Sequence, residues 1–166
     1  MISRRLIRIK VLQILYAFYN SEDKSVSRSE KELFQSIFKS FELYHLLFLL
    51  MIEVGKYAED RIEAARNKKL PTHDDLHPNT RFIENKIIAQ LRNNKAIDRF
   101  MRETKISWAG HSDLFKRLFN SLRESDFYKK YMSAPTNNYK NDRSLLVQLL
   151  LKIAAGDQLF HQTLED

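Results

Sequence analysis

Apolar residues recur every three or four positions through most of the chain, which is the spacing of an amphipathic helix. The stretches that show this spacing are residues 3–20, 27–67, 80–92, 96–105, 111–132 and 142–164. No stretch alternates apolar and polar residues over the length of a useful strand. The pattern therefore predicts an all-α protein, built as a single helical bundle of about six helices.

The first stretch, residues 3–20, is expected to form a helix with two apolar faces. A buried stripe is predicted from four residues at helical spacing: Ile7, Val11, Ile14 and Phe18. A second face is predicted from four more: Leu12, Leu15, Tyr16 and Tyr19. We therefore expect the rest of the protein to enclose the C-terminal half of this helix, which leaves only the N-terminal half open to a partner.

The longest stretch, residues 27–67, is the expected central helix. Ser27 and Glu30 fit a capping box at its start, and Gly55 is expected to bend or divide it. Its apolar residues keep the helical period over many turns: Phe34, Ile37, Phe38, Phe41, Phe48 and Ile52. Around residues 43–52 the apolar positions lie on several sides, so this part of the helix should be enclosed.

Two loops interrupt the pattern where prolines and polar residues gather, at residues 70–79 and 133–141. The helix after Gly110 is expected to reach Met132, and the last helix is expected to run towards Leu164. Candidate caps for the helices after the two loops are Asn79 or Thr80 and Asn141 or Asp142. The last helix should bury Leu145, Leu146, Leu149, Leu150 and Ile153.

Composition supports a folded helical chain, since apolar residues make up 43% of the 166 residues and there are only three glycines and three prolines. This length suits one domain, residues 1–166, and the helix-like sequence at its end suggests the N-terminal part of a longer chain. Cysteine is absent, so the sequence predicts no disulfide, no thiolate metal site and a reducing, cytoplasmic location. The most apolar run, Leu46 to Ile52, is far shorter than the roughly 20 residues that span a bilayer, so no membrane partner is expected.

Positive charge is concentrated at the start of the chain. The net charge is +7, and the first ten residues contain Arg4, Arg5, Arg8 and Lys10 but no acid. A helix N-terminus already presents positive charge through the backbone dipole, so an external anion should hold these side chains there. Because guanidinium groups fork onto phosphates and stack on bases, RNA is the economical partner.

Three alternatives to RNA remain open for this basic start. The arginines could pair with carboxylates of the same domain, or simply extend into solvent at a frayed helix end. The helix could dock on an acidic groove of another protein, which would make the chain a non-enzymatic protein interaction module. A basic amphipathic helix also suits a membrane surface, although stable attachment normally needs more exposed apolar area or a lipid.

Catalytic and cofactor signals are weak. The three glycines are far apart in sequence, which excludes a phosphate-binding loop at the level of motif. The sequence THDDLH, with His73, Asp74, Asp75 and His77, contains metal-ligand residue types, but a solvated loop whose acids cap a helix explains it better. His45 is expected to be a hydrogen-bonded core residue. We therefore predict no enzyme activity, no metal and no cofactor.

The first helix resembles that of the NusB family of bacterial antitermination factors in the pattern R-R-x-x-R-x-x-x-x-Q-x-L-Y, formed by Arg4, Arg5, Arg8, Gln13, Leu15 and Tyr16. This all-helical family binds the boxA element of ribosomal RNA leader transcripts together with NusE, a ribosomal protein, within the transcription elongation complex. The resemblance implies RNA contacts by the arginines, Gln13 and Tyr16, and a packing role for Leu15. Lys10 would add long-range attraction to the RNA.

The resemblance covers about 20 residues and leaves part of the family pattern unmatched. The C-terminal signature is missing, and Leu118-Phe119-Asn120-Ser121-Leu122 is a poor substitute for it. Long members of the family separate the first helix from the conserved half by a large helical insertion, and this chain is similar to such an N-terminal portion. This chain is also similar to the NusB-like module of ribosomal RNA methyltransferases. That resemblance likewise implies that the chain binds RNA and does not catalyse a reaction.

Overall fold

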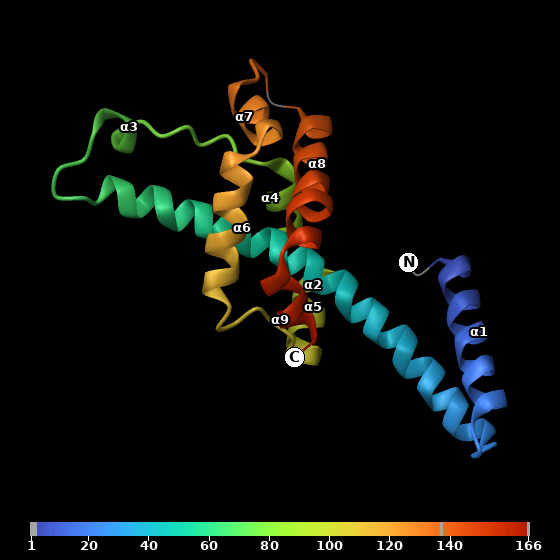
Figure 1. Cartoon of the computed structure of the whole chain (residues 1–166). Helices are drawn as coiled ribbons and strands as arrows, with labels where there is room; N and C mark the ends of the chain where they lie inside the picture. The colour runs from blue at the N-terminus through green and yellow to red at the C-terminus, as the bar shows by residue number, and fades with distance from the viewer. Residues whose placement is uncertain (1–2, 137, 166) are drawn as a thin grey trace. The chain divides into compact units, whose positions relative to one another are not determined.

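The computed structural model describes residues 3–136 and 138–165, and within these ranges all regular structure is helical (Figure 1). The all-α prediction is confirmed, although the described residues form nine α-helices rather than about six. The chain divides into two compact units, Met1–Leu46 and Leu47–Asp166.

Unit 1 is a helical hairpin of α1 (Arg4–Asn20) and the first part of α2 (Val26–Arg66). The Ser3 hydroxyl caps α1 by accepting a hydrogen bond of 3.2 Å from the backbone N–H of Leu6. At the start of α2, the Ser25 hydroxyl accepts from the N–H of Arg28 at 3.3 Å. The predicted capping box at Ser27 is wrong because the helix already begins at Val26, which places Ser27 inside it.

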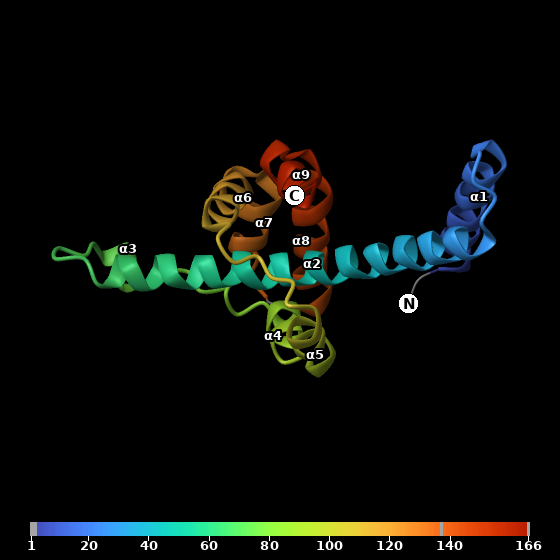
Figure 2. The same ribbon diagram turned by 90° about the horizontal axis from the view of Figure 1, so that it is seen from below.

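Unit 2 surrounds the second part of α2. Figure 2 shows α4 and α5 on one side of this helix and α6 to α9 on the other. The bounds are α3 (His73–Leu76), α4 (Lys86–Arg92), α5 (Lys95–Thr104), α6 (Ser112–Glu124), α7 (Asp126–Ser133), α8 (Tyr139–Gln148) and α9 (Gln158–Glu165). The apolar side chains with no exposed surface at the centre of the core are Leu50, Val54, Leu118, Leu122 and Leu149.

Gly55 does not divide α2, which continues to Arg66. A Cβ atom at this position would lie 3.0 Å from Cγ2 and 3.1 Å from Cδ1 of Ile88 on α4, and Ile88 is only 1% exposed. Glycine is therefore placed here because α4 packs closely against the α2 backbone.

Helix caps in unit 2 come from residues other than those predicted. Asn85, which is fully buried, caps α4 by accepting from the N–H groups of Ile87 at 2.9 Å and Ile88 at 3.3 Å. The predicted caps Asn79 and Thr80 are wrong because the chain forms turns before α4 begins. Asn138 caps α8 by accepting from the N–H of Asn141 at 2.8 Å. Ser125 ends α6 and caps α7, so no single helix runs from residue 112 to Met132.

Asp142 lies inside α8 with no exposed surface, where its carboxylate joins three elements. Its Oδ1 accepts a hydrogen bond of 2.8 Å from the hydroxyl of Tyr131 on α7. Its Oδ2 accepts from the N–H of Lys86 in the first turn of α4 at 3.1 Å, and its backbone oxygen accepts from Asn85 at 3.2 Å. The predicted role of Asp142 as a helix cap is therefore wrong, and its role is to join α4, α7 and α8.

The last helical stretch is broken rather than continuous. After α8 come a π-helix at Leu149–Ile153 and a 3₁₀ turn at Ala154–Gly156. Asp157 then begins α9, since its Oδ1 accepts from the N–H of Phe160 at 3.1 Å. The same carboxylate pairs with Nε of Arg117 on α6 at 2.6 Å, which holds the break against α6.

The loop with the sequence THDDLH contains a short capped helix. Asp75 Oδ2 accepts from the N–H of Thr72 at 3.0 Å, and the Thr72 hydroxyl accepts from the N–H of Asp75 at 3.2 Å, which completes a capping box. Lys68 Nζ lies 2.8 Å from the same carboxylate. The hydrogen bond from Lys68 is the largest cause that lowers the pKa of Asp75 to about 2, followed by the hydrogen bond from Thr72.

Removal of the Lys68 ammonium group should raise the pKa of Asp75 from about 2 towards its ordinary value of 3.8. A carboxyl whose folded pKa is depressed stabilises the fold above its unfolded pKa, and that contribution disappears as the pH falls through the folded pKa. NMR titration of the Asp75 side-chain carboxyl carbon in wild type and Lys68→Met would measure the change. An identical titration midpoint in both proteins would contradict the assigned cause, and Lys69→Met serves as the neighbouring control.

Candidate nucleic-acid interface

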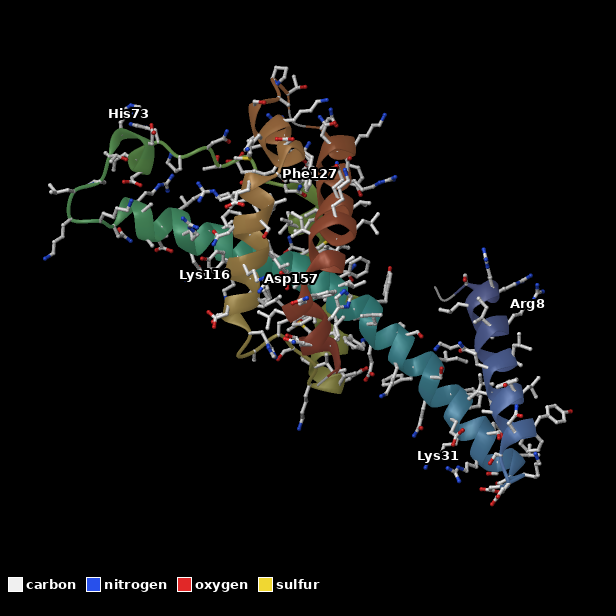
Figure 3. All side chains as sticks on the ribbon, in the orientation of Figure 1. Arg8, Lys31, His73, Lys116, Phe127 and Asp157 are labelled. Carbon is white, nitrogen blue, oxygen red and sulfur yellow. The ribbon has the colours of Figure 1, made fainter. Side chains whose placement is uncertain are left out.

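The arginines of α1 lie on the surface of unit 1. The side chains of Arg4, Arg5 and Arg8 are exposed, and Figure 3 shows Arg8 projecting from α1 on the side away from α2. Among the residues that the structure describes, no carboxylate forms an ion pair with any of the three. Their guanidinium groups are therefore available to an external anion.

Two carboxylates close in sequence to α1 are paired with a different cation. Arg28 on α2 contacts Asp23 at 3.2 Å and Glu32 at 3.0 Å. These two contacts, with Glu32 contributing most, raise the pKa of Arg28. The alternative in which the arginines of α1 pair with nearby acids of the same domain is therefore not supported within the described part of unit 1.

Exposed apolar and aromatic side chains continue the arginine surface along the helix. At 100° per residue, Arg4, Arg5 and Arg8 fall within the same sector as four residues of the following turns. Those residues are Leu12 at 68%, Leu15 at 47%, Tyr16 at 72% and Tyr19 at 75% exposure. We call these seven side chains the outer face of α1.

The prediction that the C-terminal half of α1 is enclosed is wrong, and the packing role expected for Leu15 does not bury it. No described residue of α1 is buried. Val11, Ile14 and Phe18 are half-buried on the predicted stripe, while Ile7 is 38% exposed. Within unit 1 the hairpin supplies one neighbouring helix, and one neighbour covers one stripe only. The second apolar face therefore remains in contact with solvent.

Lys10 and Gln13 are not on the outer face. Lys10 is half-buried, and its Nζ donates a hydrogen bond of 2.7 Å to the hydroxyl of Ser36 on α2. Gln13 is exposed on the flank between the outer face and the stripe that faces α2. The structure thus places Arg4, Arg5, Arg8 and Tyr16 on one side of α1, and Lys10 and Gln13 lie outside that side.

Tyr19 joins the outer face although it is not among the predicted RNA-contact residues. Its position three residues after Tyr16 places it on the same side of the helix, and this spacing is the signal that could have identified it. Exposed aromatic rings can stack on bases of a single strand, and exposed guanidinium groups can bind phosphates. The outer face combines both groups on one helix.

The histidines do not form a catalytic arrangement in the described residues. His45 is 6% exposed, and its Nδ1 lies 2.9 Å from the backbone oxygen of Phe41, which confirms the expected hydrogen-bonded core histidine. The rings of His73 and His77 lie 4.6 Å apart on the exposed loop. In the described ranges no three histidine or acidic side chains come together as a metal-binding group.

Trp108 is 5% exposed and packs near Phe160, with ring centroids 6.2 Å apart. It therefore anchors the segment between α5 and α6.

None of the described helices combines the length and the apolar character needed to cross a membrane.

Comparison with known proteins identifies no protein similar to this chain. No protein family model matches the chain, and no curated protein and no solved structure gives a significant match. A functional assignment for the outer face of α1 therefore depends on its residues and on the resemblance of the first helix.

Proposed function

We propose that this chain is an RNA-binding protein of the NusB type that acts in antitermination of ribosomal RNA transcription. The outer face of α1 would bind a single-stranded, boxA-like segment. The observation that carries the proposal is the presence of three exposed arginines, without carboxylate partners among the described residues, beside two exposed tyrosine rings.

The two parts of the outer face would contribute different interactions. Arg4, Arg5 and Arg8 would bind phosphates, where the guanidinium fork and the positive end of the helix dipole act in the same direction. Tyr16 and Tyr19 would stack on unpaired bases, which every base permits because each has a π-face. Lys10 would attract the RNA over a longer distance without a direct contact, because Ser36 already holds its ammonium group.

The proposed partners follow from the resemblance of the first helix. NusE and the transcription elongation complex would supply affinity that three arginines alone do not provide.

An alternative function is favoured by Leu12, which is 68% exposed on the same face. An apolar side chain at this position suits a protein surface better than RNA, so docking of α1 on an acidic protein groove is the second candidate.

Titration of a fluorescently labelled boxA-type RNA tests the proposal. Replacement of Arg4, Arg5 and Arg8 together by alanine should weaken binding by about 2 kcal/mol, or about 30-fold, through loss of three charge-assisted contacts. Wild type should show a log-log salt slope of about −2, from about −0.7 for each phosphate contacted on a single strand. The triple variant should show a nearly flat salt response.

A charge-matched control separates the outer face from general attraction. The exposed cations Lys129, Lys140 and Arg143 of unit 2 can be replaced together by alanine, which removes the same total charge. Equal affinity of wild type and the α1 variant, or an equal loss in both triple variants, would reject the RNA role of α1. Recovery of a protein partner after nuclease treatment, with no RNA present, would favour the docking function.

A further inference from the structure

A cavity of about 610 Å³ opens in unit 2 between the end of α2, the segment around α3, and helices α6 and α7. Its size falls within the range of small-molecule sites, roughly 300–1,000 Å³. It lies in the part of the chain that the outer face of α1 does not involve, and the RNA proposal makes no use of it.

The floor of the cavity is aromatic and rigid. Phe82 is 2% exposed and Phe119 is 6% exposed, and their ring centroids lie 5.8 Å apart with an interplanar angle of 35°. Ala58 of α2 adds a small side chain that leaves space in front of these rings. The two tilted rings give the floor an aromatic, apolar character that suits the apolar body of a ligand.

Tyr128 presents an unused polar group to this cavity. Its side chain lines the cavity while the residue is only 9% exposed, and no described residue forms a hydrogen bond with its hydroxyl. Burial raises the pKa of Tyr128 to about 12, against the opposing effect of the Arg123 charge. The phenol therefore stays protonated near neutral pH and can donate a hydrogen bond.

Two guanidinium groups give the cavity a positive rim. Arg61 is oriented by a hydrogen bond of 3.1 Å from its Nη1 to Oδ1 of Asn120. Arg123 also lines the cavity and forms no ion pair with a described residue.

Two carboxylates line the same cavity but oppose this charge only in part. Asp75 is paired with Lys68 at 2.8 Å, so the two charges largely cancel. The side chain of Asp74 is fully exposed, with a relative accessibility of 103%, and its single charge offsets at most one of the two guanidinium charges. The rim that faces the aromatic floor is therefore positive overall.

We propose that this cavity binds a small organic anion with a planar apolar body. The body lies on Phe82 and Phe119. The anionic group accepts a hydrogen bond from the Tyr128 hydroxyl and pairs with Arg123, with Arg61 adding positive charge at the entrance.

Titration of the full chain with 2-naphthoate tests this site, followed by the fluorescence of the naphthyl ring and by NMR shifts of the α6 and α7 amides. The uncharged analogue 2-naphthalenemethanol should bind about tenfold more weakly, because it lacks the charge that pairs with Arg123. Arg123→Gln should weaken naphthoate binding about tenfold and leave binding of the alcohol unchanged. Tyr128→Phe should weaken naphthoate binding severalfold while keeping the ring in place.

Two further variants separate site binding from general effects. Lys129→Gln removes an exposed cation that does not line the cavity and should leave binding unchanged. Ala65→Phe fills the entrance from the surface of α2 and should abolish binding, with the circular dichroism of the helices retained. The proposal is overturned if naphthoate and the alcohol bind equally, if Ala65→Phe binds as wild type does, or if no binding occurs at millimolar concentration.

Discussion

Asp142→Ala should lower the free energy of unfolding by about 3 kcal/mol, because it removes a buried acceptor that two donors share and leaves the Tyr131 hydroxyl only its longer bond of 3.3 Å to the backbone oxygen of Arg81. The Tyr131 hydroxyl and the N–H of Lys86 both donate to this carboxylate, and the carboxylate has no exposed surface. Each buried donor left unsatisfied costs about 1–3 kcal/mol. Urea denaturation followed by circular dichroism would measure the loss.

Tyr131→Phe is the matched control for Asp142→Ala. It removes one donor but leaves the bond between the carboxylate and Lys86, so the expected loss is smaller, about 1 kcal/mol. The double variant should lose less free energy of unfolding than the two single variants lose in total, because both changes remove the same hydrogen bond. A loss below about 1 kcal/mol for Asp142→Ala would show that the carboxylate is not needed to join α4, α7 and α8.

Leu118→Ala should cost a similar amount, about 3 kcal/mol, through cavity formation rather than lost hydrogen bonds. Leu118 has no exposed surface and belongs to the face of α6 that forms the core of unit 2. The size of the loss depends on how far the neighbouring side chains can move into the space. Thermal and urea unfolding would both report it, with no change expected in the helix content of the folded state.

Leu151→Ala removes the same atoms from a surface position and serves as the comparison. Leu151 is 71% exposed in the π-helix that follows α8, so its loss should change stability by less than about 0.5 kcal/mol. Nearly equal effects at the two positions would contradict the assignment of α6 as a core helix.

The helical segments could be predicted from the sequence because the spacing of apolar residues along a helix is a local property of the chain. The stripe of Ile7, Val11, Ile14 and Phe18 and the long helix around Leu50 follow directly from it. Caps are harder to predict, because Asn, Ser and Thr occur at several positions near each helix start. Only tertiary packing decides which of them is the cap, as at Asn85, whose side chain also contacts α8.

The break after α8 was not predictable from apolar spacing. Leu149 and Ala154 are both buried, and a π-turn between them changes the register of the helix by one residue. A prediction based on 3.6 residues per turn cannot include this change. The consequence of the error is visible at Leu150 and Ile153, which the spacing predicts to be buried and which are only half-buried.

The candidate site was predictable in part. Charge alone points to Arg4, Arg5 and Arg8, and the structure places all three on the surface. Sequence could not show that Tyr16 and Tyr19 are exposed, because apolar spacing indicates which residues share a side of a helix but not how many neighbours cover that side. It also could not show that Lys10 is held by Ser36, which lies 26 residues away.

None of the described residues of α1 is buried, and this affects the affinity that would be measured for a ligand of its outer face. In the described part of unit 1 its contacts lie along a single stripe, so any molecules in which α1 leaves α2 would lack the hairpin that presents the outer face. Measured affinity scales with the share of molecules that keep the hairpin, because the dissociation constant observed equals the intrinsic one divided by that competent share. A substitution that stiffens the hairpin, far from any arginine, would therefore tighten binding without adding a single contact.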